Sequence, residues 1–392
     1  MSVSVAVIGG GIGGAAATLS LLYHGIDAHL FERGPNFSEL GAGLQLSPNA
    51  TRVLHQLGLE RALAACAVEP RAWRQRRWCS GETLSAAPLS VHMKARYGYP
   101  YYHILRADLL SVLTQAIPPE RVHLGYEMTE LDQVPGGVEV NFSDGRTLKY
   151  DAVIGADGIR SRVCKSLFGD TSPRYTGCIA YRGLIDAKMI GTLNIPLETQ
   201  VWLGPGKHLV TYFVQGQKLL NFVAIMDQQK ADHESWVKPG DVLNLRAEFM
   251  GWDPVVVNLL QAAHETVCGG IFDHHPLRRW TKGNVTLLGD ACHSIVPFVA
   301  QGAGQAIEDA AVLGRCLQAT DFGTLADGLA TYERIRRRRT QKIWGVATGL
   351  KENLHLCDGP DQVARDRNLA SDTSGWLVGD LDWLYGYDAF AA

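Results

Sequence analysis

A glycine cluster near the N-terminus has the spacing of a dinucleotide-binding turn. Gly9, Gly11 and Gly14 fit the pattern GxGxxG, directly after an apolar run and before a stretch of small residues. Glu32 follows eighteen residues beyond Gly14, with Arg33 beside it. Glycines let the backbone approach a pyrophosphate, whereas a carboxylate accepts hydrogen bonds from a ribose diol and disfavours a 2′-phosphate. The motif predicts a bound dinucleotide and leaves FAD and NAD both open.

Two later segments carry further candidate chemistry. Asp157 and Arg160 follow an apolar run in the segment 155–161, which by itself also fits an ordinary Asp-Gly turn. Asp290 follows a second apolar run, and the loop from Pro297 to Gly304 then opens a helix. The N-terminus of such a helix presents backbone N–H groups and a partial positive charge, which suit an electron-rich ring.

The sequence also predicts the strands and helices that would position these residues. Apolar runs predict buried strands over 3–8, 28–31, 152–155 and 284–288, with helices over 11–23 and 302–317. The segment 122–154 reads as a meander, and strand-like runs at 200–203, 208–214 and 219–225 predict a second sheet. Because the pattern of the first domain resumes near residue 284, we expect that domain to be discontinuous.

The C-terminal third is predicted to be helical. A long helix is expected over 325–350, and its run 334–339 contains five arginines, which we interpret as a solvated face partly packed on acidic neighbours. The aromatic tail is expected to cover an apolar surface through Trp376, Trp383, Tyr385 and Tyr387.

Composition limits the classes of function. The chain has 392 residues, 46% hydrophobic and 20% charged, which is typical of a globular protein of two domains or one large one. Its formal net charge of −3 offers no basic field for nucleic acid or an anionic membrane. The eight cysteines form no zinc-type spacing, so we expect reduced thiols, no metal site and a cytoplasmic location.

The three motifs together resemble the group A FAD-dependent aromatic hydroxylases, which have the para-hydroxybenzoate hydroxylase fold. The segments "GAGLQLSPNA" at 41–50, "LRADLL" at 105–110 and the closing "WLYGYD" are most similar to one branch. That branch contains salicylate hydroxylase, 3-hydroxybenzoate 6-hydroxylase and 6-hydroxynicotinate 3-monooxygenase.

The resemblance implies an α/β fold. It consists of a Rossmann-like FAD-binding domain with an inserted, mainly β substrate domain and a C-terminal helical segment. We expect the FAD-binding domain at 1–75, 100–178 and 270–350, the substrate domain at 76–99 and 179–269, and the C-terminal segment at 351–392.

The resemblance also implies roles for matched positions. Gly9, Gly11, Gly14, Glu32 and Arg33 would hold the ADP half of FAD, Arg106 would lie near the ribityl and phosphate region, and Asp290 on the ribityl chain. Asp157 and Arg160 would serve FAD and the nicotinamide donor. The flavin ring would be lined by residues from Pro297 onward and polarised by the backbone of Gly302, Ala303 and Gly304.

A histidine and a tyrosine are the candidates for the substrate side. His208 and Tyr212 lie four residues apart on a predicted strand, so that both side chains point to one face. A neutral imidazole can accept a phenol proton, while a packed structural pair remains an alternative. His293 is a second candidate for the base, with a structural role beside the Asp290 turn as its alternative.

The expected substrate pocket also contains Gln45 and four apolar or aromatic residues. Leu46, Tyr102, Phe298 and Val299 predict apolar walls for an aromatic or heteroaromatic ring. Gln45 and Phe298 stand where the hydroxynicotinate enzymes carry histidines, so the substrate within the branch stays open.

We therefore expect a single-component FAD monooxygenase that uses NADH or NADPH and O2 to hydroxylate a phenolic or N-heteroaromatic acid, with or without decarboxylation. Its partners are expected to be small molecules, and the protein a monomer or homodimer. Two alternatives remain at this stage. One is an FAD oxidoreductase of the same fold, such as an epoxidase or a reductase of larger substrates, and the other is a nucleotide-sensing module without turnover.

Overall fold

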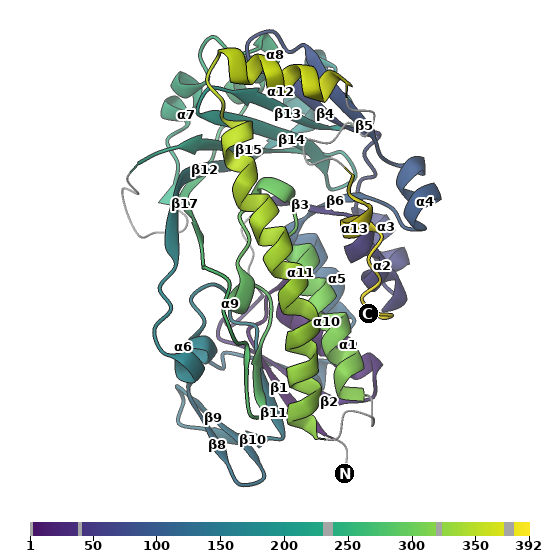
Figure 1. Ribbon diagram of the computed structural model, residues 1–392, viewed down its shortest axis with the longest axis vertical. Coiled ribbons are helices and arrows are strands. Elements are labelled where there is room, and N and C mark those ends of the chain that lie inside the picture. Colours follow the sequence, from purple (N-terminus) through teal and green to yellow (C-terminus); the bar gives the residue numbers. More distant parts are fainter. Residues whose placement is uncertain (1–2, 38–40, 230–237, 319–323, 372–379) are drawn as a thin grey trace.

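The computed structural model describes residues 3–37, 41–229, 238–318, 324–371 and 380–392. Two large sheets lie one above the other in the view of Figure 1, with the longest helix running between them. The lower sheet belongs to the part that begins with the glycine motif, and the upper sheet carries His208 and Tyr212. The candidate site is therefore built where the two parts meet.

The first sheet has a parallel centre buried on both faces. Its strand order is β18 (Thr281–Lys282), β19 (Val285–Leu287), β11 (Ala152–Gly155), β1 (Ser4–Ile8), β2 (Asp27–Glu32) and β7 (Val122–Leu124). The strands from β19 to β7 pair in parallel, and such buried strands read as continuous apolar runs. This explains why the sequence located β1, β2, β11 and β19 to within one residue at each end.

Two helices that follow the glycine-rich segments pack closely on each other. They are α1 (Ile12–Tyr23) and α10 (Gly302–Gln318). A Cβ atom at Gly314 of α10 would lie 2.5 Å from Ser20 Oγ of α1, so the close approach requires a glycine there. The packing joins the N-terminal motif to the loop that precedes α10.

The segment 122–154 forms parts of two sheets, and the prediction of one meander was wrong in this respect. A separate antiparallel sheet contains β10 (Thr147–Tyr150), β9 (Gly137–Phe142) and β8 (Met128–Val134). The flanking strands β7 and β11 instead join the first sheet. Local alternation predicts a strand but does not state which neighbour it pairs with.

The second large sheet has eight strands. Their order is β16 (Lys238–Pro239), β17 (Val267–Asp273), β12 (Arg174–Asp186), β15 (Leu219–Asp227), β14 (Lys207–Val214), β13 (Thr199–Gly204), β4 (Ala72–Arg77) and β5 (Thr83–Pro88). Helices α7 (Val242–Glu248) and α8 (Pro254–Gln261) bury one face, with Trp202 and Phe222 beneath them. The strands thus begin at residues 72 and 174 and end at 88 and 273, near the boundaries expected for the substrate domain.

A two-stranded sheet and several helices link the two parts. The sheet pairs β3 (Gly43–Leu46) with β6 (Tyr102–Leu105), and Asn221 Oδ1 of β15 accepts a hydrogen bond from Gly43 N at 2.8 Å. The remaining helical elements before α10 are α2 (Pro48–Gln56), α3 (Glu60–Cys66), α4 (Val91–Tyr97), α5 (Arg106–Gln115), η1 (Pro119–Arg121), α6 (Arg162–Phe168), η2 (Ala187–Leu193), α9 (Asp290–His293) and η3 (Pro297–Val299).

The longest helix, α11 (Leu325–Leu354), spans from the first sheet to the second. Thr324 and Asp327 form a capping box at its start, and the helix runs one turn beyond the predicted end. It is followed by α12 (Pro360–Ser371) and α13 (Asp382–Tyr385). Trp383 and Tyr385 pack on an apolar cluster as expected, while Trp376 lies outside the described residues.

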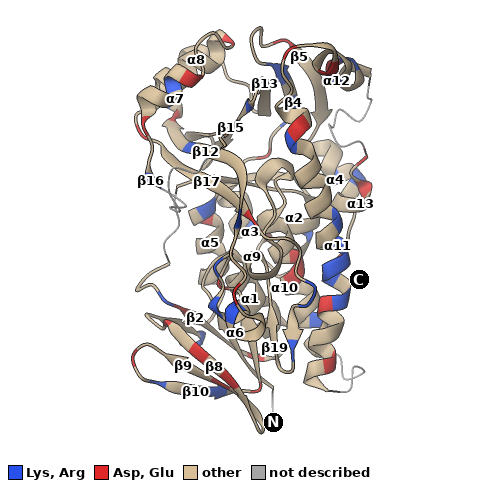
Figure 2. Cartoon of the chain, turned by 60° about the vertical axis from the view of Figure 1, so that its left-hand side comes forward, with Lys and Arg blue, Asp and Glu red and all other residues tan. Residues whose placement is uncertain are grey.

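The arginine run on α11 is only partly a solvated face. Figure 2 shows basic residues repeating along this helix, and Arg334 and Arg338 are exposed. Arg336, in contrast, is fully buried and donates to Glu308 and Asp309 of α10 at 2.5 and 2.6 Å. The run is therefore a solvated face partly packed on acidic neighbours, as expected, and Arg336 is the arginine that ties the two helices together.

Candidate active site

The predicted nucleotide residues meet at one edge of the first sheet. Gly9 directly follows β1, Glu32 ends β2, and Asp157 comes two residues after β11. Asp290 follows β19 and begins α9 at the same edge, with its side chain exposed. The carboxyl ends of parallel strands form the crevice in which α/β proteins bind nucleotides.

A cavity lies in this crevice. Its lining includes six of the predicted cofactor residues or their motif neighbours, namely Gly9, Gly11, Glu32, Arg33, Asp157 and Arg160. Arg106, the first residue of α5, donates its backbone N–H to Ala42 O at 2.8 Å next to β3, and neither it nor Asp290 lines this part of the crevice. Residues predicted for the two ends of one extended cofactor thus lie along different stretches of the crevice.

The glycines of the motif have distinct roles. Gly9 has a φ of +110°, and a Cβ there would lie 2.5 Å from Ala156 O. A Cβ at Gly14 would overlap Gly9 O at 1.8 Å. Gly11, however, has no atom within 4 Å of its Cβ position, although it lines the cavity. Gly9 and Gly14 are needed for the turn itself, while Gly11 leaves room for a ligand.

Glu32 is held in place by the turn it faces. Its Oε2 accepts a hydrogen bond from Gly10 N and its Oε1 one from Gly34 N, both at 2.8 Å. A carboxylate oxygen has capacity for a second hydrogen bond, so each oxygen can still accept from a ribose hydroxyl. The side chain is therefore fixed in an orientation that suits the predicted role.

Asp157 has a structural partner within its own loop. Its Oδ1 accepts from Ser161 Oγ at 2.5 Å, and its Oδ2 accepts from the backbone N–H groups of Arg162 and Val163 at 2.7 and 3.2 Å. These contacts cap the first turn of α6. Burial raises the pKa of this carboxyl, while the hydrogen bonds oppose the shift. Arg160, three residues on, is the member of this pair that is exposed at the cavity.

The loop before α10 is fixed by buried amides. Gln301 Nε2 donates to Ser47 Oγ at 2.8 Å, and Gln301 Oε1 accepts from Asn49 Nδ2 and from Gln305 Nε2, both at 3.1 Å. Ala300 adopts a φ of +52°, which turns the chain from η3 into α10. The Cβ position of Gly302 has no neighbour within 4 Å. The loop thus presents a rigid helix start beside open space, as a flavin ring requires.

Three observations bear on whether FAD fits this chain: the empty Cβ positions at Gly11 and at Gly302, and the fixed orientation of Glu32. A dinucleotide needs a turn without side chains, a carboxylate at the ribose and a helix N-terminus at its ring end. All three features are present along one crevice, so the described residues fit the cofactor.

His208 and Tyr212 share the face of the second sheet that looks toward this loop. The ring of His208 is 5.9 Å from that of Phe298 in an edge-on arrangement, and His208 is 2% exposed. Tyr212 is also buried, with its ring 4.5 Å from that of His103. The two residues are four positions apart along the strand, which is about 13 Å. This distance is too long for both side chains to contact the same atom.

An arginine that the sequence analysis missed lies between them. Arg182 of β12 is in the same cross-strand row as Val223, Val210, Val201 and Gln75, which pair successively across the sheet. Cross-strand neighbours point to the same face of a sheet. Arg182 therefore lies on the face that carries His208 and Tyr212.

The environment of Arg182 is unusual for a cation. No acidic side chain of the described residues forms an ion pair with this guanidinium. Burial is the main cause that lowers its pKa, and Arg106 adds repulsion. Arg182 is partly buried, and a partly buried charge without a counter-ion favours an anionic ligand. No local sequence pattern indicates a functional role for Arg182. The role is suggested by the lack of an acidic partner among the described residues, which can be seen only in the folded chain.

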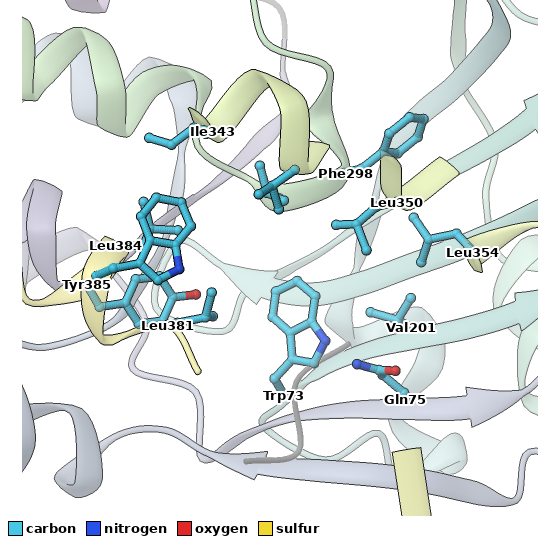
Figure 3. A pocket seen from close by; sticks show the side chains of 13 residues that line it. Trp73, Gln75, Val201, Phe298, Ile343, Leu350, Leu354, Leu381, Leu384 and Tyr385 are labelled. Atoms are coloured by element: carbon cyan, nitrogen blue, oxygen red, sulfur yellow. The ribbon is translucent and has the colours of Figure 1, made fainter. Parts of the chain in front are cut away.

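An apolar cavity extends along this row toward the C-terminal segment. Figure 3 shows Trp73 and Gln75 on one side, Phe298 and Leu350 opposite them, and Tyr385 closing one end. Val299 also lines it, so Phe298 and Val299 are where the sequence predicted them. Gln75 is 3% exposed, and its Oε1 has no hydrogen-bond partner among the described residues.

Leu46 and Tyr102 do not reach this cavity. Both belong to the core of the first part, whereas Gln45 on the opposite face accepts a hydrogen bond from Tyr101 Oη at 2.7 Å and also contacts the Tyr212 hydroxyl. Adjacent strand residues point to opposite faces, so Gln45 and Leu46 cannot both face the ligand. The structure brings only Gln45 of these three residues toward Tyr212.

His293 is bound to acidic residues behind the loop. Its Nε2 lies 2.5 Å from Asp309 Oδ2, and the ring is buried beside Trp280. Both His293 and Arg336 help to hold the pKa of Asp309 at about 2 despite burial. This arrangement supports the structural alternative for His293 and leaves His208, whose ring lies 5.9 Å from that of the cavity-lining Phe298.

Comparison with known proteins gives one consistent result. A family model described as "FAD binding domain" matches residues 2–346. A 3-amino-4-hydroxybenzoate 2-monooxygenase of Streptomyces platensis is 38% identical over 98% of this chain and 96% of its own length. A 6-hydroxynicotinate 3-monooxygenase of Pseudomonas fluorescens is 33% identical over 98% and 95%.

A solved structure agrees with these relatives. Klebsiella pneumoniae HpxO complexed with FAD and uric acid has 28% identity and a TM-score of 0.84, covering 96% of this chain and 95% of that one. These similarities support an enzyme and not a nucleotide-sensing module. No helix in the described part of the chain has the length and apolar character needed to cross a membrane.

The predicted cofactors and the predicted branch of hydroxylases are thereby confirmed, with FAD as the bound group and NADH or NADPH as the reductant. The roles of individual site residues remain predictions. The chain belongs to the FAD-binding-domain family of flavoproteins and is an FAD-dependent monooxygenase.

Proposed function

We propose that this monooxygenase hydroxylates a phenolic or N-heteroaromatic acid, with the acid group held by Arg182. The observation that carries the proposal is the guanidinium of Arg182, which shares a sheet face with His208 and Tyr212 and has no acidic partner among the described residues. A ring carboxylate would supply the missing counter-ion. The names of the relatives support the same class, since they act on hydroxybenzoates and a hydroxynicotinate.

Each part of the site then has one task. The crevice around Gly11 and Glu32 would hold the ADP half of FAD, and the backbone at Gly302 to Gly304 would face its ring. FAD supplies the redox chemistry, because its reduced form reacts with O2 so that one oxygen atom can be inserted into the substrate. Val210 and Phe298 would exclude water from the ring to be hydroxylated.

Proton removal from the substrate makes its ring electron-rich. We assign this task to His208, whose imidazole is neutral because burial holds its pKa well below the usual value. Tyr212 has a raised pKa from burial, so it would act as a neutral hydrogen-bond donor near Gln45 at the other end of the ligand. We further propose a cytoplasmic protein that is a monomer or homodimer.

The test compares acids with their neutral amides. Purified holoenzyme would be mixed with NADH and one of salicylate, 3-hydroxybenzoate, 3-amino-4-hydroxybenzoate or 6-hydroxynicotinate, or with the corresponding carboxamide. We expect one acid to yield a product with one added oxygen atom, while its amide binds at least tenfold more weakly because it cannot pair with Arg182.

Variants of Arg182 make the test specific. Arg182→Gln should lose the preference for acid over amide, and Arg182→Lys should keep part of it. Equal turnover of acid and amide by the unchanged protein would refute the role of Arg182. Absence of oxygenated product from every aromatic acid would refute the substrate class in favour of the larger or non-aromatic substrate.

A further inference from the structure

A chain of three side chains connects His208 to the protein surface. His208 Nδ1 lies 2.7 Å from His355 Nε2, and His355 Nδ1 lies 2.9 Å from Asp227 Oδ1. His208 is fully enclosed, His355 is 3% exposed in its side chain, and Asp227 is 43% exposed. The three residues thus connect the buried ring beside Phe298 with a carboxylate that is partly exposed to solvent.

One arrangement of protons on the two rings satisfies both contacts and leaves His208 with a free basic nitrogen. Asp227 is ionised, since its neighbours hold its pKa at about 2, and it accepts the Nδ1–H of His355. In the arrangement that we propose, the Nε2 of His355 accepts the Nδ1–H of His208. His208 is left with Nε2 as its basic atom, which has no hydrogen-bond partner among the described residues.

The two histidines, His208 and His355, differ in how well their surroundings can accommodate a positive charge. His208 is a poor place for a proton because it is buried. At His355 a positive charge would lie next to the Asp227 carboxylate, which His355 Nδ1 contacts at 2.9 Å. His355 is also the C-cap residue that directly follows the long helix α11, where the helix dipole favours a cation. A proton taken up at His208 would therefore move toward His355.

We propose that Asp227 and His355 are positioning residues that let His208 act as the base, forming a proton path from the substrate to solvent. This inference rests on the proposed function. In the forward step the substrate O–H bond breaks and an Nε2–H bond forms on His208. The Nδ1–H of His208 then passes to Nε2 of His355, leaving a phenolate and an imidazolium paired with Asp227. Reversal of both transfers restores the resting state.

The other charged and titratable groups at the path are few among the described residues. Lys351 of α11 lies 3.3 Å from Asp227 Oδ1, and the thiol of Cys178 on β12 donates to the same oxygen at 3.4 Å. Lys351 also donates to Thr176 O at 3.3 Å. A purely structural surface contact would involve Lys351 as much as His355, and this provides the control.

The first measurement observes the tautomers without any ligand. Nitrogen NMR of the holoenzyme with isotope-labelled histidine, assigned with His208→Gln and His355→Gln, should show both rings as neutral Nδ1–H tautomers near neutral pH. An Nε2–H tautomer at either ring would overturn the proposed path.

The second measurement uses the acid that the unchanged protein hydroxylates, and compares Asp227→Asn with Lys351→Met. Asp227→Asn keeps the size of the side chain but removes the charge. We expect it to lower kcat at least tenfold, with little change in KM, and to shift the acidic limb of the pH profile to lower pH by about one unit, because the negative charge that favours the imidazolium is lost. Asp227→Glu should recover part of the rate, and Lys351→Met should resemble the unchanged protein.

Two outcomes separate the claims. Equal effects of Asp227→Asn and Lys351→Met would mean that Asp227 serves only the surface contact, and the proton path would be wrong while the proposed function stands. Failure of the unchanged protein to hydroxylate any acid would contradict the proposed function, whereas the tautomers would still report on the path.

Discussion

Gly11 and Gly14 belong to one motif but have different physical reasons for being glycine. Gly14 is required by the protein, since a Cβ there would overlap Gly9 O. Gly11 has an ordinary φ of −75° and an empty Cβ position at the cavity. An alanine can therefore adopt the backbone of Gly11, and its methyl group would enter the space assigned to FAD.

This difference predicts that Gly11→Ala folds but binds FAD at least tenfold more weakly. The melting temperature of the FAD-free form should stay within a few degrees of that of the unchanged FAD-free protein. Flavin absorbance per protein after gel filtration measures binding, and Gly349→Ala on α11, which also has an empty Cβ position, is the control. Full flavin content in Gly11→Ala would contradict the assignment of this cavity to FAD.

At the scale of elements, one buried cluster holds α10 and α11 together behind the flavin loop. Arg336 donates to Glu308, Asp309 and Gln305, while Arg339 donates to Glu308 at 2.7 and 2.8 Å. Glu308 also accepts from Asn49 Nδ2 at 2.6 Å, and Asn49 donates to the Gln301 amide of the loop. The position of the loop thus depends on how the two helices pack.

Arg336→Met should lower the free energy of unfolding by about 3–5 kcal/mol, because it leaves the buried carboxylate of Asp309 without its guanidinium. Chemical denaturation of the FAD-free protein measures this loss. Arg338→Met removes an exposed charge two positions away and should change stability by less than about 0.5 kcal/mol. Similar losses of unfolding free energy in both variants would show that the buried cluster does not stabilise the protein more than an exposed arginine does.

At the scale of the whole molecule, neutral histidines are enclosed where the two parts meet. His103 of β6 is 1% exposed, and its Nε2 lies 2.7 Å from Thr199 Oγ1 of β13. Burial lowers its pKa to about 3 from 6.5. Between these values the unfolded chain binds a proton that the folded chain does not. Folding stability is therefore lost as pH falls through this window.

We expect His103→Gln to weaken this pH dependence. Below pH 6 the unchanged protein should lose up to about 1.4 kcal/mol of unfolding free energy per pH unit through His103 alone. Denaturation at several pH values between 6 and 4 measures the slope, and the exposed His92→Gln serves as the control. An unchanged slope in His103→Gln would mean that His103 does not remain neutral in the folded protein.

Several features of this molecule could be predicted from short stretches of sequence. The turn at Gly9 to Gly14, the buried strands β1 and β11, and the shared face of His208 and Tyr212 each depend on residues close together in the chain. Backbone conformation and strand alternation are local properties, so a single sequence contains enough information to identify them. The family resemblance added the cofactor and the class of reaction.

Other features depend on residues far apart in the chain. His355 lies 147 positions from His208 and 128 from Asp227, and nothing in the helical pattern of α11 indicates those partners. The solitary charge of Arg182, the burial of Arg336 and the exclusion of Leu46 from the cavity are likewise consequences of packing. The glycine turn follows from local sequence, and the class of enzyme follows from the resemblance that the motifs carry. The side chains proposed for the substrate site become evident in the folded chain alone, because burial and pairing of charges arise when distant segments come into contact.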